Sequence, residues 1–352
     1  MLLNTKSYKD SQLKKMDRII VSRADSIGDV SLTLPMCAWI KDKFPGATLV
    51  FLGKEYTRQL VSIFNKIDEF LALEDLIDLP LTQRLEAIKA DAILHVFPSR
   101  EIASLAKKAR IPLRIGTSHR AFHLLTCNKR MGFTRKRSDL HEAQLNFHLL
   151  KPLGLTQIPP MSEVQQLAEN FHPNKQELPP LFNNIDLSKT VILHPKSKGS
   201  AKEWPINSYL ELCNELIKLE IPVIFTGTND EGNLFRHFIP NHSLVINATG
   251  LLSLGELIFL ISQVRGLVAC STGPYHIAGL CNRKAVGLFS SQRPMHPGRW
   301  HALGKKTTWL TYDVNCQACT KKKKCMCIEK ISVAQVLQVL LDDSVKGNLS
   351  LE

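Results

Sequence analysis

The chain has 352 residues, of which 44% are hydrophobic and 22% are charged, a composition typical of a soluble globular protein. No apolar run reaches the ~20 residues that a bilayer-spanning helix needs, which argues against a transmembrane segment. The formal net charge of +13 favours an anionic partner, such as nucleic acid, an acidic membrane surface or a phosphorylated small molecule, although a basic surface also serves solubility.

The first 17 residues are polar and lack the continuous apolar core of a secretion signal. We therefore predict a flexible extension over residues 1–17 and a cytoplasmic protein. Five of the nine cysteines are scattered, and in a reducing cytosol we expect them to be small core residues. These are Cys37, Cys127, Cys213, Cys270 and Cys281.

Residues 18–160 alternate between strand and helix patterns and are predicted to form an N-terminal Rossmann-like domain. Residues 34–44, for example, place Met36, Trp39, Ile40 and Phe44 at helical spacing before Pro45. Strands are expected at 18–23, 47–53, 91–97 and 113–118, and helices at 34–44, 56–64, 81–90 and 100–109.

Residues 161–188 are rich in proline and asparagine around one short helical piece, which is typical of a linker between domains. The alternation resumes over residues 189–335, the predicted C-terminal Rossmann-like domain, and residues 336–352 complete a terminal helix and tail. Strands are expected at 190–195, 221–228, 243–249, 266–271 and 284–290, and helices at 208–220, 230–238, 254–264, 273–281 and 332–343. This pattern predicts two doubly wound α/β domains facing a central cleft, with ligands at the carboxyl ends of the strands.

The turn "RADSIGDVSLTLP", residues 23–35, follows the first strand, where α/β proteins often bind a phosphate. A phosphate site needs backbone N–H groups and positive charge, yet this turn contains one glycine, Gly28, and two acids, Asp25 and Asp29. A carboxylate here would repel a diphosphate, so we expect the diphosphate in the other domain. Asp25 is predicted to stabilise the turn or to cap a helix.

The first of three polar loops in the second half is "HPKSKGSAKEWP", residues 194–205. Its lysines, Lys196, Lys198 and Lys202, together with Ser200 in a Gly-Ser pair, suit a diphosphate. A solvated lysine loop explains this segment equally well.

The second loop, residues 226–233, has Thr226 at a strand end and Glu231 in the next helix, where a carboxylate could hold ribose hydroxyls. Acids in a first helical turn are favourable without any ligand, and the residues alone favour that interpretation. The third loop, "ACSTGPYHIAG", places Ser271, Thr272 and Gly273 at a helix start and His276 in its first turn, which predicts an anion site. A capped helix with a buried histidine is the alternative.

Four cysteines cluster in "CQACTKKKKCMC": Cys316, Cys319, Cys325 and Cys327. The Cys-x-x-Cys half is similar to half of a zinc site, whereas the Cys-x-Cys half is tighter than usual. A structural metal, a redox-sensitive pair and plain thiols all remain open, and a structural role is favoured over a catalytic one.

Basic residues also gather in the first half, including Lys54, Arg58 and Arg120, and they could bind an acidic acceptor at a membrane surface. A solvated basic face is the simpler explanation. Aromatic residues do not interleave with these charges, so no nucleic acid is expected. The sequence contains no Walker motif, Gly-x-Gly-x-x-Gly fingerprint or His-Glu-x-x-His motif, which disfavours P-loop hydrolysis, ordinary NAD chemistry and zinc peptidase chemistry.

From about Arg18 to the final helix, the chain resembles the family 9 glycosyltransferases, the bacterial lipopolysaccharide heptosyltransferases. The resemblance depends on "SIGDVSLTLP", "HP…KEWP" and "STGPYHIAG", in this order and at this spacing. It implies the GT-B fold, with the acceptor on the N-terminal domain and the nucleotide-sugar donor on the C-terminal one. It also implies inverting transfer of heptose from ADP-heptose to lipopolysaccharide core or a similar anionic glycolipid, without a required metal or cofactor, at the inner face of the cytoplasmic membrane.

The resemblance also implies roles for particular residues. Asp29 matches the catalytic base, which takes the proton of the acceptor hydroxyl, and Lys202 matches a lysine at the donor's phosphate and sugar. Glu231 matches an acid at the ribose, and Thr272, Gly273 and His276 match the diphosphate loop, which stabilises the leaving group. Family members usually have aspartate at the position of Ser271, and this difference bears on the donor sugar more than on the reaction.

The four-cysteine cluster occurs in some family members as well. Two other functions stay open at this stage. One is a GT-B-like nucleotide-sugar epimerase or hydrolase, against which Ser271 argues mildly. The other is a basic module that binds nucleic acid or membrane, which explains the net charge but leaves Asp29 and the ordered donor loops without a role.

Overall fold

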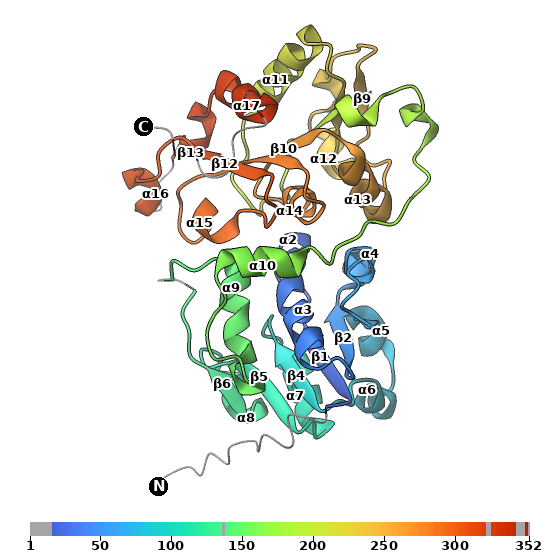
Figure 1. The fold of residues 1–352 in the computed structure, drawn as a ribbon, viewed down its shortest axis with the longest axis vertical. Helices are drawn as coiled ribbons and strands as arrows, with labels where there is room; N and C mark the ends of the chain where they lie inside the picture. Colours follow the sequence, from blue (N-terminus) through green and yellow to red (C-terminus); the bar gives the residue numbers. More distant parts are fainter. Residues whose placement is uncertain (1–15, 136–137, 322–324, 343–348, 351–352) are drawn as a thin grey trace. The chain divides into compact units, whose positions relative to one another are not determined.

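The computed structural model describes residues 16–135, 138–321, 325–342 and 349–350 (Figure 1). Most of the predicted N-terminal extension lies outside these residues. Contacts divide the chain into two compact units. The first unit comprises residues 1–25, 33–134 and 143–170, and the second comprises residues 26–32, 135–142 and 171–352.

The first unit is built on a six-stranded parallel sheet in the order β3-β2-β1-β4-β5-β6 (Figure 1). Its inner strands are almost entirely buried and apolar, as expected for a parallel sheet covered on both faces. The order reverses between β1 and β4, which is the arrangement of a doubly wound sheet. The strands are β1 (Arg18–Ser22), β2 (Thr48–Gly53), β3 (Glu69–Ala72), β4 (Ala92–His95), β5 (Leu113–Thr117) and β6 (Lys129–Met131).

The helices of this unit cover the sheet with apolar side chains. On one face Ile20, Val50 and Ile93 of the strands pack with Ile102 and Ala106 of α7. The helices are α3 (Leu34–Lys43), α4 (Arg58–Ser62), α5 (Leu73–Asp78), α6 (Leu81–Ala87), α7 (Arg100–Lys108), α8 (Ala121–Thr126), α9 (Glu142–Phe147) and α10 (Met161–Ala168). The helix α10 packs on α3, so the segment predicted as a linker begins with a helix of the first unit.

The second unit is built on a seven-stranded parallel sheet in the order β13-β12-β11-β10-β7-β8-β9 (Figure 1). The order reverses between β7 and β10, so the loops that follow these two strands flank the switch point where such sheets bind ligands. The strands are β7 (Val191–His194), β8 (Val223–Phe225), β9 (Val245–Asn247), β10 (Gly266–Cys270), β11 (Lys284–Leu288), β12 (Thr307–Thr311) and β13 (Leu349–Ser350).

A large apolar core joins this sheet to α11 and α17. Val333, Val336 and Leu340 of α17 are buried, whereas Leu337 and Leu341 are only partly buried. The helices are α2 (Ile27–Ser31), α11 (Ile206–Lys218), α12 (Asn229–Asn233), α13 (Leu254–Gln263), α14 (Gly273–Leu280), α15 (Pro297–Trp300), α16 (Gln317–Thr320) and α17 (Val333–Leu341). Within the described residues, no helix has the length and apolar character required to cross a membrane.

Candidate active site

The short helix α2 carries Asp29 and packs on α14, which follows β10. Two glycines allow this close approach. A Cβ on Gly28 would lie 2.8 Å from Cδ2 of His276, and a Cβ on Gly273 would lie 3.0 Å from the Ile27 side chain. These contacts explain why residues 26–32, although they follow the first strand of the chain, group with the second unit.

Asp29 is partly buried, and its Oδ2 accepts a hydrogen bond of 2.5 Å from Oγ of Ser26. His276 on α14 is buried, and this burial lowers the pKa of its imidazole to about 4, while the Asp29 carboxylate opposes the shift. The imidazole is therefore neutral near pH 7. A carboxylate and a neutral imidazole thus lie within electrostatic reach of each other at the start of α14.

The N-terminus of α14 offers hydrogen-bonding groups that the described protein does not use. Its N-cap residue, Thr272, makes no side-chain cap, and Pro274 occupies the first turn. Oγ1 of Thr272 and Nδ1 of His276 are buried and have no hydrogen-bond partner among the described residues. An unpaired buried polar atom costs about 1–3 kcal/mol, so a polar ligand at this helix start would be stabilised. Ser271 lies directly before it and is partly buried.

The loop after β7 is organised around Glu203, a residue to which the sequence analysis gave no role. Its carboxylate pairs with Nζ of Lys196 at 2.8 Å and accepts hydrogen bonds from N and Oγ of Ser197. Lys196 is therefore held within the loop. Lys198 and Ser200 are exposed, and Nζ of Lys202 donates to the carbonyl oxygen of Cys325 at 3.3 Å.

A second polar group lies at the ends of β7 and β8. Nδ1 of His194 is 2.9 Å from Oγ1 of Thr226, and burial lowers the pKa of His194 to about 4, against the carboxylates of Glu231 and Glu203. Oε2 of Glu231 accepts hydrogen bonds from N and Oγ1 of Thr228 and closes a capping box on α12. Glu231 therefore stabilises the N-terminus of α12, the helix that follows β8.

The predicted acceptor residues of the first unit follow different strands of the sheet and do not form one cluster. Lys54 and Arg58 follow β2, whereas Arg120 follows β5, and two strands separate β2 from β5 in the sheet. Arg58 pairs with Glu55 at 2.7 Å and with Asp75 at 3.5 Å, and its guanidinium lies over the Phe70 ring. Arg120 is exposed and Lys54 is partly buried.

Sequence reasoning missed a buried ion-pair network in the second unit. Glu142 is 1% exposed and accepts hydrogen bonds from Arg299 at 2.6 and 2.9 Å and from Arg135 at 3.0 Å. In the same unit, Arg293 pairs with Asp139 at 2.8 Å. Nothing in the sequence around Glu142 indicated a partner as far along the chain as Arg299.

The structure brings the four clustered cysteines together. Their sulfur atoms all lie within 4.8 Å of one another, with Cys316 and Cys325 at 3.4 Å and Cys325 and Cys327 at 2.9 Å. All four are free thiols, and three of them are buried.

Two doubly wound α/β units, with polar loops and a helix N-terminus at the switch point of the second sheet, are the architecture of the GT-B fold. The model described as glycosyltransferase family 9 (heptosyltransferase) matches residues 79–328, and the chain belongs to this family. The resemblance, the fold class and the enzyme class expected from the sequence are thereby confirmed.

Individual relatives agree with this assignment. A Haemophilus influenzae protein is 25% identical over 337 residues, which span 92% of this chain and 95% of the relative. The lipopolysaccharide core heptosyltransferase OpsX of the same bacterium is 24% identical over 316 residues, which span 85% and 86% of the two chains. The structure of the E. coli ADP-heptose lps heptosyltransferase II shares the fold with a TM-score of 0.70 at 19% identity, over 94% of this chain and 100% of that chain.

Proposed function

We propose that the protein transfers a sugar from a nucleotide-diphosphate donor to lipopolysaccharide core or a similar anionic glycolipid, and that ADP-heptose is the donor. The family and the names of its relatives support this choice, because one is a lipopolysaccharide core heptosyltransferase and another an ADP-heptose heptosyltransferase. The single observation that carries the proposal is the packing of α2 on α14, which holds Asp29 beside His276 and the open helix start.

In this proposal the donor diphosphate binds at the N-terminus of α14. Backbone N–H groups, Thr272, Gly273 and His276 surround the phosphates, and Lys202 adds a positive charge. Thr226 directly follows β8, and Glu231 lies in α12, the helix after that strand, where its carboxylate holds the ribose hydroxyls. Ser271 faces the sugar, and Lys196, Lys198 and Ser200 contribute less, since Lys196 already pairs with Glu203.

The chemistry assigned to Asp29 is general base catalysis. A sugar hydroxyl is a weak nucleophile at neutral pH, and a carboxylate can take its proton as the oxygen attacks the anomeric carbon. The bond to the diphosphate breaks in the same step, and its electron pair leaves with the diphosphate, which α14 and Lys202 stabilise without a metal ion. A single displacement inverts the anomeric configuration.

The acceptor and the location of the enzyme complete the proposal. We assign the acceptor to the first unit, with Lys54 and Arg120 as candidate contacts and Arg58 a weaker one because of its two ion pairs. The net charge of +13 supports a cytoplasmic enzyme that contacts the anionic inner face of the membrane peripherally.

The proposed base is tested with Asp29→Asn. We expect donor affinity close to that of the wild type and a turnover reduced roughly 10²–10⁴-fold, because the amide cannot accept the proton. The matched control is Asp78→Asn, an exposed aspartate at the end of α5, which should leave both quantities unchanged. Calorimetric titration measures the donor affinity, and a transfer assay measures the turnover. Near-normal turnover of Asp29→Asn would show that Asp29 is not the base.

The donor class is tested by thermal unfolding in the presence of ADP, UDP, GDP and their sugars. We expect ADP and ADP-heptose to raise the melting temperature most, because a ligand that binds only the folded state stabilises it. If RNA or anionic vesicles raised it and no nucleotide did, the protein would be a binding module rather than a transferase.

A further inference from the structure

The four-cysteine cluster lies outside the proposed transfer chemistry, and its geometry is that of a metal site. Cys316 is the N-cap residue of α16 and Cys319 lies within that helix, whereas Cys325 and Cys327 come from the segment after it. In a tetrahedral site with Zn–S bonds of about 2.3 Å, the sulfur atoms lie about 3.8 Å apart. The four sulfur atoms here are all within 4.8 Å of one another and approach to 3.4 and 2.9 Å, so they surround a point that one ion can occupy.

The packing around the cluster supports the same conclusion. Among the described residues, the buried cysteines form a small cluster with Ala318 and Cys325, separate from the large apolar core of the unit. Such a cluster buries little hydrocarbon, so packing alone gives this segment little stability. In the sequence, four lysines, at 321–324, lie between the second and third cysteines.

We propose that Cys316, Cys319, Cys325 and Cys327 bind one structural metal ion, zinc or iron, through four thiolates. Four thiolates leave no open coordination position, so the ion has no direct part in catalysis. The sulfur atoms of Cys325 and Cys327 are 2.9 Å apart, well beyond the ~2.05 Å of a disulfide, so all four cysteines are available as ligands in the structure.

The metal site also positions the donor loop. Nζ of Lys202 donates to the carbonyl oxygen of Cys325, and Nε1 of the buried Trp204 donates to that of Ile331 at 2.9 Å. These hydrogen bonds fasten residues 202–204 to the segment that carries the third and fourth thiolates. Metal binding therefore orders Lys202. This second part of the inference depends on the proposed donor role of Lys202, whereas the metal site itself does not.

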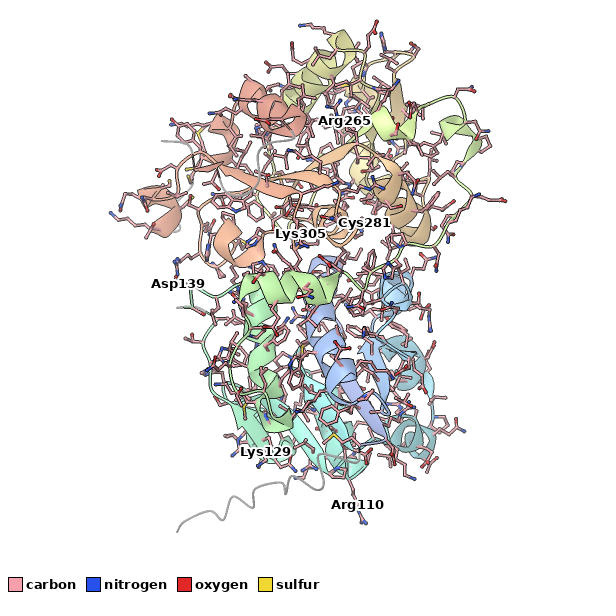
Figure 2. All side chains as sticks on the ribbon, in the orientation of Figure 1. Arg110, Lys129, Asp139, Arg265, Cys281 and Lys305 are labelled. Carbon is pink, nitrogen blue, oxygen red and sulfur yellow. The ribbon has the colours of Figure 1, made fainter. Side chains whose placement is uncertain are left out.

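Elemental analysis of the purified full-length protein tests the site. We expect about one zinc or iron ion per chain, with iron identified by visible thiolate-to-iron absorption and zinc by its lack of colour. Cobalt substitution should give the absorption of tetrahedral thiolate coordination. Cys316→Ser/Cys327→Ser should lose the ion, whereas the matched control Cys281→Ser, at the partly buried cysteine that follows α14 (Figure 2), should retain it.

Two results overturn the metal site. One is less than about 0.1 ion per chain together with no cobalt spectrum in the wild-type protein, which needs no variant to fold. The other is an intact mass about 2 or 4 Da below that of the reduced chain, which shows disulfides instead.

Donor binding tests the coupling to Lys202. The double cysteine variant should raise the KM for the donor roughly 10-fold, with a smaller effect on kcat, and adding Lys202→Ala should not weaken binding further. If the ion is lost and the KM stays unchanged, the positioning role is wrong while the metal site stands. If the wild-type protein contains the ion and binds no nucleotide, the proposed function fails and the metal site again stands.

Discussion

Gly28 shows how a single missing side chain sets the geometry of the candidate site. A Cβ there would lie 2.8 Å from a ring carbon of buried His276, which has little room to move. We expect Gly28→Ala to lower the free energy of unfolding by about 1–3 kcal/mol and to reduce transfer, because α2 must move away from α14.

Gly46 provides the matched control for this substitution. A Cβ at Gly46 meets no atom within 4 Å, so Gly46→Ala should be neutral or stabilising by up to about 1 kcal/mol. Urea unfolding and the transfer assay measure both variants. Equal stability of the two would mean that α2 is held less tightly on α14 than the contacts indicate.

The sequence indicated those residues of the site that belong to a local motif. It did not indicate residues whose position depends on other parts of the fold. Asp29 lies in α2, the first helix after β1, and Thr272 and His276 lie at the start of α14, the first helix after β10, where the sequence pattern had placed them along the chain. Glu203 was missed because its partners, Lys196 and Ser197, are fixed by a loop conformation that no motif indicates, and the Glu142–Arg299 pair was missed because it is set by tertiary packing. Arg299 and Glu142 are 157 residues apart in the chain.

At the scale of the helix, Glu231 serves two purposes that one substitution can separate. Its carboxylate caps α12, and a glutamine can close the same capping box. We expect Glu231→Gln to keep the melting temperature and to weaken donor binding several-fold, because charged hydrogen bonds to ribose hydroxyls are stronger than neutral ones.

The capping box of α13 supplies the control for that prediction. Ser253 and Glu256 form the same pair of hydrogen bonds on a helix to which no donor contact is assigned. Glu256→Gln should therefore leave donor affinity unchanged in calorimetry. If Glu231→Gln behaved like Glu256→Gln, the carboxylate of Glu231 would have only a capping role.

Most elements with a buried apolar run or clear helical periodicity were predicted, whereas the buried strand β12 and several short elements were not. The strands β1, β2, β4, β7 and β10 are buried apolar runs, and α7, α11 and α13 follow clear helical periodicity. The edge strands β3 and β6 have four and three residues and are partly exposed, so they lack both signals. The helices α8, α9 and α16 are equally short, with six residues or fewer.

For the whole molecule, buried neutral histidines predict a loss of stability in acid. Burial lowers the pKa of His95 to about 3 and those of His194 and His276 to about 4, below the usual 6.5. Between these values the unfolded chain binds protons that the native protein does not. The native protein therefore has the full contribution of these neutral histidines to its stability above about pH 6.5. It loses that contribution as the pH falls toward 4.

Urea unfolding at pH 7.5 and pH 5.5 measures this effect, and we expect a fall of roughly 2–4 kcal/mol in the free energy of unfolding. His95→Phe should flatten part of the fall, because neither ring nitrogen of buried His95 has a partner among the described residues. The exposed His242→Gln should not change it. A stability that is flat or rising over this interval would contradict the assignment.

The path of the chain limits how far the two units can be separated or exchanged as independent modules. The chain contributes three segments to each unit, and so it passes from one to the other five times. A cut near residue 170 would yield a second half without residues 26–32, which cover α14, and without Glu142, the partner of buried Arg299. Exchange of donor specificity between relatives by swapping C-terminal halves therefore requires that these two short segments be exchanged with them, whether in evolution or in the design of chimaeras.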